Sequence, residues 1–271
     1  MWILYLMAVI GGVALLLLLA IVPGKRRDTA PFHYTRYAHR GLHTDDGHIP
    51  ENSLAAFRAA AQAGYGVELD VQFTADRQIV VFHDNTLKRM CGVDNRVDEL
   101  TYDEVKQLRL LDSDQHIPLL SEVLEALDGA TLLCEFKAMR SYTDTSLCSA
   151  ALPYLDAYKG AVCIESFNPF MVRWFYRHAP QYIRGILSKK FEKGEVAQVL
   201  RFPLSSLFAN QLCHPDFIAY QHTDHTQFFF RLCCLFRPMT VAWTVQSPAE
   251  ESVAKQRFDT VIFEGYFPAE K

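Results

Sequence analysis

The chain has 271 residues, of which 50% are hydrophobic and 21% are charged, and this composition is typical of a globular protein. It excludes collagen-like, low-complexity and disordered chains. The 27 basic and 31 acidic side chains give a formal net charge of −4 without an extended basic stripe, so nucleic acid is not an expected partner. The seven cysteines lack the spacing of a zinc site and are expected to be reduced, buried thiols.

The first 22 residues, Met1 to Val22, contain no charged side chain and are almost all apolar. A helix of this length covers about 30 Å, the thickness of the hydrocarbon core of a bilayer. No basic region precedes the apolar run, as it would in a cleaved signal peptide, so we expect one transmembrane anchor at residues 1–22. A retained export signal is the alternative.

A basic juxtamembrane segment, residues 23–36, follows the apolar run and contains Lys25, Arg26 and Arg27. Lysine and arginine flank membrane spans mainly on the cytoplasmic side. The pattern therefore predicts a single-pass protein of the cell membrane. Its main domain, residues 37–271, is expected to lie in the cytoplasm.

Short apolar or β-branched runs then alternate with helical patterns, which favours a parallel sheet covered by helices. The nine predicted strands are Arg36–His39, Val67–Val71, Ile79–His83, Leu132–Phe136, Ala161–Ile164, Ile183–Leu187, Phe217–Tyr220, Val241–Val245 and Thr260–Phe263. About 250 residues without a linker is a usual size for one α/β TIM (β/α)8 barrel, which is the predicted fold. About seven residues join the second strand to the third, too few for a helical crossover, so one strand is wrongly assigned or these two form an irregular pair.

Two connections between the strands can be interpreted further. Asn52 or Ser53 can cap a helix that begins near Leu54 and ends at Gly64. Residues 85–118, after the third strand, are polar and mixed and contain a predicted short helix at Tyr102–Leu108. We interpret them as a small insertion near the mouth of the barrel.

Acidic side chains share one face of the second predicted strand. Because side chains alternate along a strand, Glu68 and Asp70 point the same way, and a cation between two buried carboxylates would relieve their repulsion. Glu135 on the fourth strand is a possible third oxygen ligand. Such a set suits Ca²⁺, Mg²⁺ or Mn²⁺ better than Zn²⁺. The alternative is the solvent-facing side of an ordinary amphipathic strand.

Lys137 and two histidines complete the polar side chains at the predicted strand ends. Lys137 would present positive charge to an anionic group such as a phosphate ester, or else reach solvent as an ordinary strand-end lysine. His39 and His83 each end a strand, where the catalytic groups of barrels gather, and two imidazoles can divide general acid and general base roles. Taken singly, each histidine can instead be structural.

Five motifs, in the same order along the chain, resemble those of the glycerophosphodiester phosphodiesterase family. With the predicted anchor, the chain looks like a membrane-anchored member of the bacterial type. The five motifs are Ala38-His39-Arg40-Gly41, Pro50-Glu51-Asn52-Ser53, Glu68-Leu69-Asp70-Val71, Val81-Phe82-His83-Asp84 and Glu135-Phe136-Lys137. The resemblance is strongest over residues 37–137. It departs from the family near the C-terminus, where Phe263-Glu264 replaces the usual Thr-Asp pair.

The resemblance implies a role for each of these side chains. The implied acid–base pair is His39 and His83. The implied ligands of one divalent cation are Glu68, Asp70 and Glu135, with Glu51 as a possible addition near the metal. The implied contacts to phosphate and substrate are Arg40, Lys137 and Trp243, of which Trp243 can equally be a core aromatic residue.

The reaction that the resemblance implies is hydrolysis of glycerophosphodiesters to glycerol 3-phosphate and an alcohol. A membrane anchor would bring the enzyme close to lysophospholipids, so a lysophospholipase D is the alternative. A non-catalytic, membrane-anchored lipid-binding module is the alternative of another class. The lipid bilayer is an expected partner in each case, and the apolar run Phe228–Phe236 is either a buried barrel helix or a second membrane contact.

Overall fold

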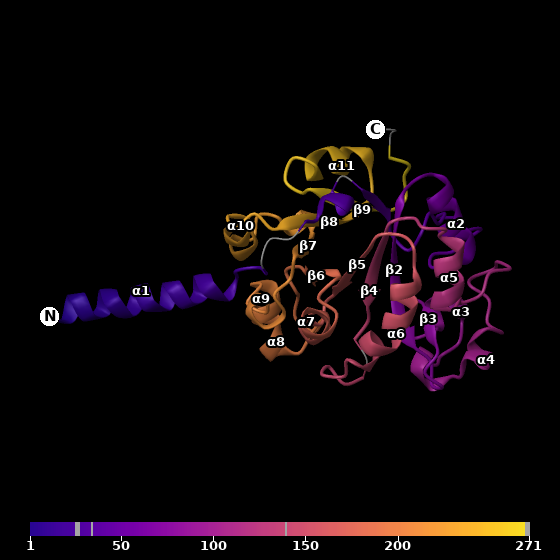
Figure 1. The fold of residues 1–271 in the computed structure, drawn as a ribbon, viewed down its shortest axis with the longest axis horizontal. Coiled ribbons are helices and arrows are strands. Elements are labelled where there is room, and N and C mark those ends of the chain that lie inside the picture. The colour runs from indigo at the N-terminus through magenta and orange to yellow at the C-terminus, as the bar shows by residue number, and fades with distance from the viewer. Residues whose placement is uncertain (25–27, 34, 139, 269–271) are drawn as a thin grey trace.

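The computed structural model describes residues 1–24, 28–33, 35–138 and 140–268 (Figure 1). Eight parallel strands close into one ring in the order β1-β2-β4-β5-β6-β7-β8-β9, and β9 pairs again with β1. These strands are β1 (Arg36–Ala38), β2 (Gly66–Phe73), β4 (Leu132–Phe136), β5 (Val162–Ser166), β6 (Ile183–Ser188), β7 (Phe217–Gln221), β8 (Met239–Val245) and β9 (Thr260–Phe263). The predicted TIM barrel is therefore confirmed.

The ninth strand lies outside the ring. Strand β3 (Ile79–Val81) pairs antiparallel with β2, with Val71 opposite Val81. The second and third predicted strands thus form the irregular pair that their short connection suggested. All nine predicted strands exist, and their ends differ from the predicted ones by at most two residues.

Helices connect consecutive strands and cover the outside of the ring (Figure 1). They are α2 (Leu54–Gln62), α5 (Leu120–Ala126), α6 (Ser146–Ala157), α7 (Pro169–His178), α8 (Gln198–Ser205), α9 (Asn210–Cys213), α10 (Phe228–Cys234) and α11 (Pro248–Ala254). Ser53, not Asn52, caps α2, because its Oγ accepts a hydrogen bond from the Ala56 N–H at 3.1 Å. Gly64, at φ +74°, lies two residues past the end of α2.

Residues 85–118 form a small lobe beside β3. It contains α3 (Lys88–Cys91), α4 (Tyr102–Val105), which is shorter than the predicted helix, and the 3-10 turn η2 (Val97–Glu99). Leu87, Met90 and Leu110 belong to an apolar cluster of this lobe that is separate from the main core. The cluster also includes Val80 of β3 and Phe82, so it packs the lobe against the barrel.

The interior of the barrel is apolar at its amino-terminal end. Phe32, from the 3-10 turn η1 (Ala30–Phe32), packs there with Tyr37, Ile183 and Met239. On the strands, alternate side chains enter this interior and the others pack beneath the surrounding helices. A Cβ atom at Gly185 would lie 2.1 Å from the Phe217 ring, so the missing side chain makes room for that ring.

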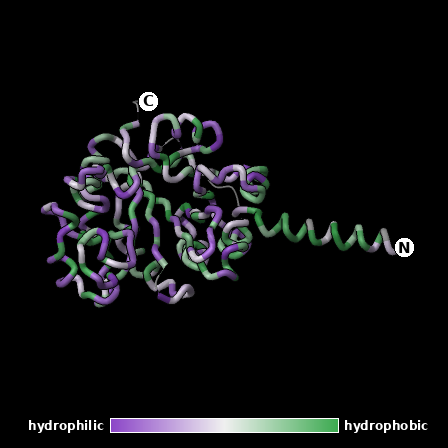
Figure 2. Tube along the Cα trace, turned by 180° about the vertical axis from the view of Figure 1, so that it is seen from behind, coloured by the Kyte–Doolittle hydropathy of each residue, from purple (hydrophilic) through white to green (hydrophobic). Residues whose placement is uncertain are grey.

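Helix α1 (Trp2–Ala20) projects away from the barrel (Figure 1). It has no charged residue and is coloured as mainly hydrophobic in Figure 2. Side chains such as Leu6, Ile10 and Leu16 are exposed. Within the residues that the structure describes, no helix is both long enough and apolar enough to cross a membrane. The transmembrane span predicted at residues 1–22 is therefore not supported. The basic residues Lys25, Arg26 and Arg27 lie outside the described residues.

The chain after α1 is fixed to the amino-terminal end of the barrel. The Ile21 carbonyl accepts a hydrogen bond from Asn210 Nδ2 at 2.8 Å, and the Gly24 N–H donates to the Pro215 carbonyl at 2.7 Å. Pro215 precedes β7. Helix α1 therefore joins the barrel at the end opposite to the carboxyl-terminal ends of the strands.

Candidate active site

Three buried carboxylates meet at the carboxyl-terminal end of the barrel. Glu68 and Asp70 extend from β2 and Glu135 from β4, and each offers an oxygen within 4.8 Å of the other two. The side chains share one face because strand register places Asp70 beside Glu135. The exposed fraction is 2% for Glu68, 0% for Asp70 and 7% for Glu135. A solvent-facing strand, the alternative interpretation, is therefore wrong.

Lys137 points into this carboxylate cluster and not to solvent. Its Nζ lies 2.8 Å from Asp70 Oδ1 and 2.9 Å from Glu135 Oε1. Burial opposes the charge of Asp70, but Lys137 and His83 outweigh it and hold the pKa of Asp70 well below its usual value. Burial raises the pKa of Glu68, and the charges of Asp70 and Glu135 raise it further. The cluster therefore lacks sufficient positive charge for three ionised carboxylates.

This imbalance fits a divalent cation. Lys137 supplies one positive charge directly to the cluster, and the three carboxylates supply only oxygen donors. Calcium, magnesium and manganese prefer such donors. Among the described residues the group that could hold a metal ion consists of Glu68, Asp70 and Glu135 and does not include Glu51.

Arg40 borders the cluster through a tight backbone turn. Its N–H donates to Glu68 Oε2 at 3.0 Å, and its guanidinium lies 3.5 Å from Asp70 and donates to Glu51 at 2.7 Å. Arg40 has φ +54° and Gly41 has φ +80°. A Cβ atom at Gly41 would lie 2.8 Å from the backbone of Ala56, so glycine is required where the turn meets α2.

His39 is held by a carboxylate from the opposite end of the chain. Its Nδ1 lies 2.5 Å from Glu264 Oε2, and its Nε2 lies 4.0 Å from Glu68 Oε2. Burial lowers the pKa of His39, although Glu264 opposes this shift. The hydrogen bond with His39 and the nearby ring of His43, whose Nε2 lies 3.8 Å from Glu264 Oε2, outweigh burial and hold the pKa of Glu264 well below its usual value. An ionised Glu264 accepts the Nδ1 proton, which leaves Nε2 of a neutral His39 unprotonated.

His83 has a similar arrangement in a more exposed place. Its Nδ1 lies 2.7 Å from Asp84 Oδ1, and its side chain is 34% exposed. Arg89, from α3, donates to both Asp84 and Glu51, at distances between 2.7 and 3.1 Å. The small lobe thereby contributes a cation to the rim of the site. Glu51 binds two arginines and lies outside the carboxylate cluster.

A hollow of about 420 Å³ opens beside the cluster and is lined by His83, Glu135, Lys137 and Phe167, among others. Trp243, at the end of β8, packs edge to face on Phe167 with ring centroids 5.5 Å apart and is half-buried. Within the described residues its buried Nε1 has no hydrogen-bond partner. Trp243 is therefore a core contact that packs on Phe167, a residue of the hollow.

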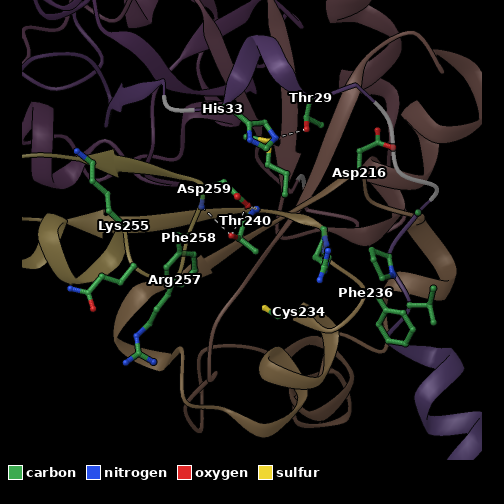
Figure 3. A pocket seen from close by; sticks show the side chains of 17 residues that line it. Thr29, His33, Asp216, Cys234, Phe236, Thr240, Lys255, Arg257, Phe258 and Asp259 are labelled. Carbon is green, nitrogen blue, oxygen red and sulfur yellow. Dashed lines mark hydrogen bonds between the residues drawn. The ribbon is translucent and has the colours of Figure 1, made fainter. Parts of the chain in front are cut away.

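A larger hollow, of about 630 Å³, lies at the other end of the barrel (Figure 3). Asp259 accepts hydrogen bonds from the backbone and hydroxyl of Thr240 there, at 2.7 and 3.0 Å. Lys255 and Arg257 extend in different directions in Figure 3, so their charges do not converge on one point. None of the predicted site residues lines this hollow.

Four charged side chains at the site were not assigned roles from the sequence: Asp84, Arg89, Glu165 and Glu264. Glu165 of β5 is 1% exposed and faces Glu135 in the strand register. Asp84 follows His83 directly, and Glu264 departs from the usual Thr-Asp pair, so both carried a signal in the sequence. Arg89 lies in the insertion and had none.

The model of the glycerophosphoryl diester phosphodiesterase family matches residues 39–257 of this chain. A glycerophosphodiester phosphodiesterase of Caldanaerobacter subterraneus subsp. tengcongensis is 32% identical over 162 residues, which are 55% of this chain and 65% of that protein. A lysophospholipase D of Homo sapiens is 34% identical over 149 residues, which are 49% of this chain and 46% of that protein. These matches cover less than two thirds of either relative.

Solved structures share the barrel. A phosphodiesterase of Oleispira antarctica in complex with the product sn-glycerol-3-phosphate has a TM-score of 0.72 at 22% identity, over 86% of this chain and 94% of that chain. A glycerophosphodiester phosphodiesterase of Thermotoga maritima has a TM-score of 0.65 at 24% identity, over 85% of this chain and 94% of that chain. At these identities the likeness concerns the fold.

Proposed function

We propose that this chain, which belongs to the glycerophosphoryl diester phosphodiesterase family, hydrolyses glycerophosphodiesters to glycerol 3-phosphate and an alcohol. The observation that carries the proposal is the buried group of Glu68, Asp70, Glu135 and Lys137 between two carboxylate-bound histidines. Burying so many charges costs stability, and clusters that carry this cost are typical of functional sites. This cost argues against a non-catalytic lipid-binding module.

Glu68, Asp70 and Glu135 would hold one divalent cation, either Ca²⁺, Mg²⁺ or Mn²⁺. When bound, the cation supplies a Lewis acid that polarises a phosphoryl oxygen and stabilises its developing charge. The carboxylates are already brought together by the register of β2 and β4. Little rearrangement of the strands is therefore needed to bind it.

The two histidines divide the proton transfers. His39, neutral and unprotonated at Nε2, takes at that atom the proton of the attacking water. If the glycerol hydroxyl attacks instead, His39 takes its proton, a cyclic phosphate forms as the alcohol leaves, and water opens that ring in a second step to give glycerol 3-phosphate. His83, fixed through Nδ1 by Asp84, delivers a proton from Nε2 to the oxygen of the leaving alcohol. Glu264 and Asp84 orient the two rings and do not exchange protons with the substrate.

Lys137 and Arg40 supply positive charge for the phosphate. Both are within 3.5 Å of Asp70, so the phosphate would share these cations with carboxylates that are already in place. Trp243 and Phe167 form an apolar wall at the mouth, against which the leaving alcohol would lie. Arg89 and Glu51 offer polar groups at the rim of the site.

A lysophospholipase D is the second candidate. The similar human protein with that name and the aromatic wall of Trp243 and Phe167 both favour it. Against it, α1 joins the barrel at the end opposite to the carboxylate cluster. A water-soluble diester therefore comes first in our proposal. A cell-membrane location with the barrel on the cytoplasmic side stays a prediction from the sequence.

The test is release of glycerol 3-phosphate from glycerophosphocholine by the full chain, after EDTA treatment and then after addition of Ca²⁺, Mg²⁺ or Mn²⁺. We expect release only with metal, and none with Glu68→Gln. Glu125→Gln, on the outer surface of α5, is the matched control and should keep full activity. Lysophosphatidylcholine is the parallel substrate. Release from neither substrate, with any of the metals, would overturn the proposal.

A further inference from the structure

Aromatic side chains gather on the outside of the barrel where α1 joins it. Phe202 of α8 and Phe229 of α10 have ring centroids 5.9 Å apart, and Phe208 and Phe228 lie 5.2 and 5.3 Å from Phe229. We call these four residues the aromatic rim. Phe202 is 57% and Phe228 69% exposed. A contiguous patch of exposed aromatic residues indicates a surface that binds another apolar surface, such as a protein or a membrane.

The rim is continuous with the attachment of α1. Asn210, at the start of α9, and Cys233, in α10, both donate hydrogen bonds to the Ile21 carbonyl. Past the end of α10, Leu235 is 74% exposed, and Phe236 lines the hollow of Figure 3 together with Val22 and Pro23. Helix α1 therefore leaves the barrel on the side where α8, α9 and α10 lie (Figure 1).

The charges around the rim are almost all positive. Arg231 and Arg237 are exposed, Arg201 is half-buried, and within the described residues none of the three forms an ion pair with a carboxylate. The segment from Gln198 to Pro238 contains only two acidic residues, Asp216 and Asp224. Asp216 is buried against Arg184, so it contributes little to the surface.

We propose that the aromatic rim docks on the surface of an anionic lipid bilayer, with its phenylalanines among the acyl chains and its arginines on the headgroups. Aromatic rings and basic side chains are the combination that binds such interfaces. A second copy of the chain fits less well, because the same arginines would face one another across a two-fold interface. The proposal does not depend on the hydrolytic activity, since it concerns side chains outside the site.

The first test follows the position of the rim in the full chain. A Trp2→Phe background removes the tryptophan of α1, and Phe228→Trp then places a reporter in the rim. Phe267→Trp is the matched control, because Phe267 is 73% exposed and follows β9, outside α8, α10 and the attachment of α1. The vesicles contain phosphatidylcholine and phosphatidylglycerol, with brominated phosphatidylcholine as the quencher.

We expect the emission of Phe228→Trp to shift to the blue and to lose intensity with brominated vesicles, and that of Phe267→Trp to stay unchanged relative to the background protein. Equal quenching in both variants, or in neither, would overturn the proposal. A blue shift of Phe228→Trp that needs no vesicles and grows with protein concentration would also overturn it, in favour of a second copy.

The second test concerns the charges. Arg231→Gln and Arg237→Gln should each weaken binding to phosphatidylglycerol-containing vesicles about fivefold and leave binding to pure phosphatidylcholine unchanged. Arg58→Gln, an exposed arginine on α2, is the control and should bind as the parent does. Equal binding by all three variants would show that the rim arginines do not meet the headgroups.

Discussion

The two ends of the barrel interior differ although the same strands build both. Near the amino-terminal end, Leu133 of β4 packs with Phe32 and Met239 in an apolar layer. Two residues later, on the same face of β4, Glu135 lies among charges. A single strand thus passes from a layer that stabilises the fold to one that destabilises it. We expect substitutions at the two ends to have separable effects on stability and on activity.

The largest effect should come from the histidines at the carboxyl-terminal end. His39→Gln or His83→Gln removes one proton carrier, so we expect the rate of glycerol 3-phosphate release to fall about 100- to 10,000-fold. Both side chains are partly exposed, so the free energy of unfolding in urea should change little. A loss of stability that accounts for the loss of rate would contradict the separation of the two ends.

The opposite outcome is expected at the amino-terminal end. Phe32→Ala leaves a cavity in the apolar layer at the amino-terminal end of the barrel and should lower the free energy of unfolding by about 3–5 kcal/mol. The rate per folded molecule should stay unchanged, as measured at low temperature where the variant is folded. Phe267→Ala, at an exposed site, is the control for loss of a phenyl ring and should unfold as the parent does.

A smaller loss of rate is expected from the residue that orients His39. Glu264→Gln should lower kcat about 10- to 100-fold, the range for groups that orient a working histidine. Because Glu264 raises the pKa of His39, the variant should lower that pKa. A base with a lower pKa stays unprotonated in more acid solution, so the acid limb of the pH–rate profile should move to lower pH. A change in KM alone would argue against orientation of the ring.

The smallest effect concerns two buried glutamates whose pKa values shift in opposite directions. Hydrogen bonds from Lys255 and Arg36 outweigh burial and lower the pKa of Glu251. Ionised Glu251 therefore adds about 1 kcal/mol to the free energy of unfolding above pH 5, and this stabilisation is lost in acid. Burial raises the pKa of Glu165, so the folded protein loses stability as pH rises and this buried carboxyl group must ionise. Urea unfolding across pH in EDTA should show less acid sensitivity for Glu251→Gln and greater stability at high pH for Glu165→Gln. Parallel curves for the two variants would contradict these signs.

The alternation of residues along each strand was enough to predict the carboxylate cluster. Leu132–Phe136 and Thr260–Phe263 have the predicted bounds, and the period of two places Glu68 and Asp70 on one face. Periodicity alone did not place the run at 228–236. There Phe230 is buried and stacks on Tyr220, whereas Phe228 is exposed, because neighbouring strands and helices decide which side is covered.

Contacts between distant residues could not be derived in the same way. Glu264 binds His39 across 225 positions of the chain, and Arg89 reaches Glu51 across 38. Local sequence patterns indicate the residue types in each element. Which side chains come into contact is decided by closure of the ring and by the position of the small lobe. The turn that carries Arg40 and Gly41 at positive φ is likewise set by the fit of Gly41 against α2.

The pairing of β1 with β9 has a consequence for biosynthesis. β1 is synthesised well before β9, but its place in the ring requires β9. Until then the nascent sheet has two open edges, and His39 has no carboxylate from Glu264. The barrel is therefore expected to acquire its acid–base geometry only after β9 has been made, and a chain that stops before residue 260 should remain inactive and prone to aggregate.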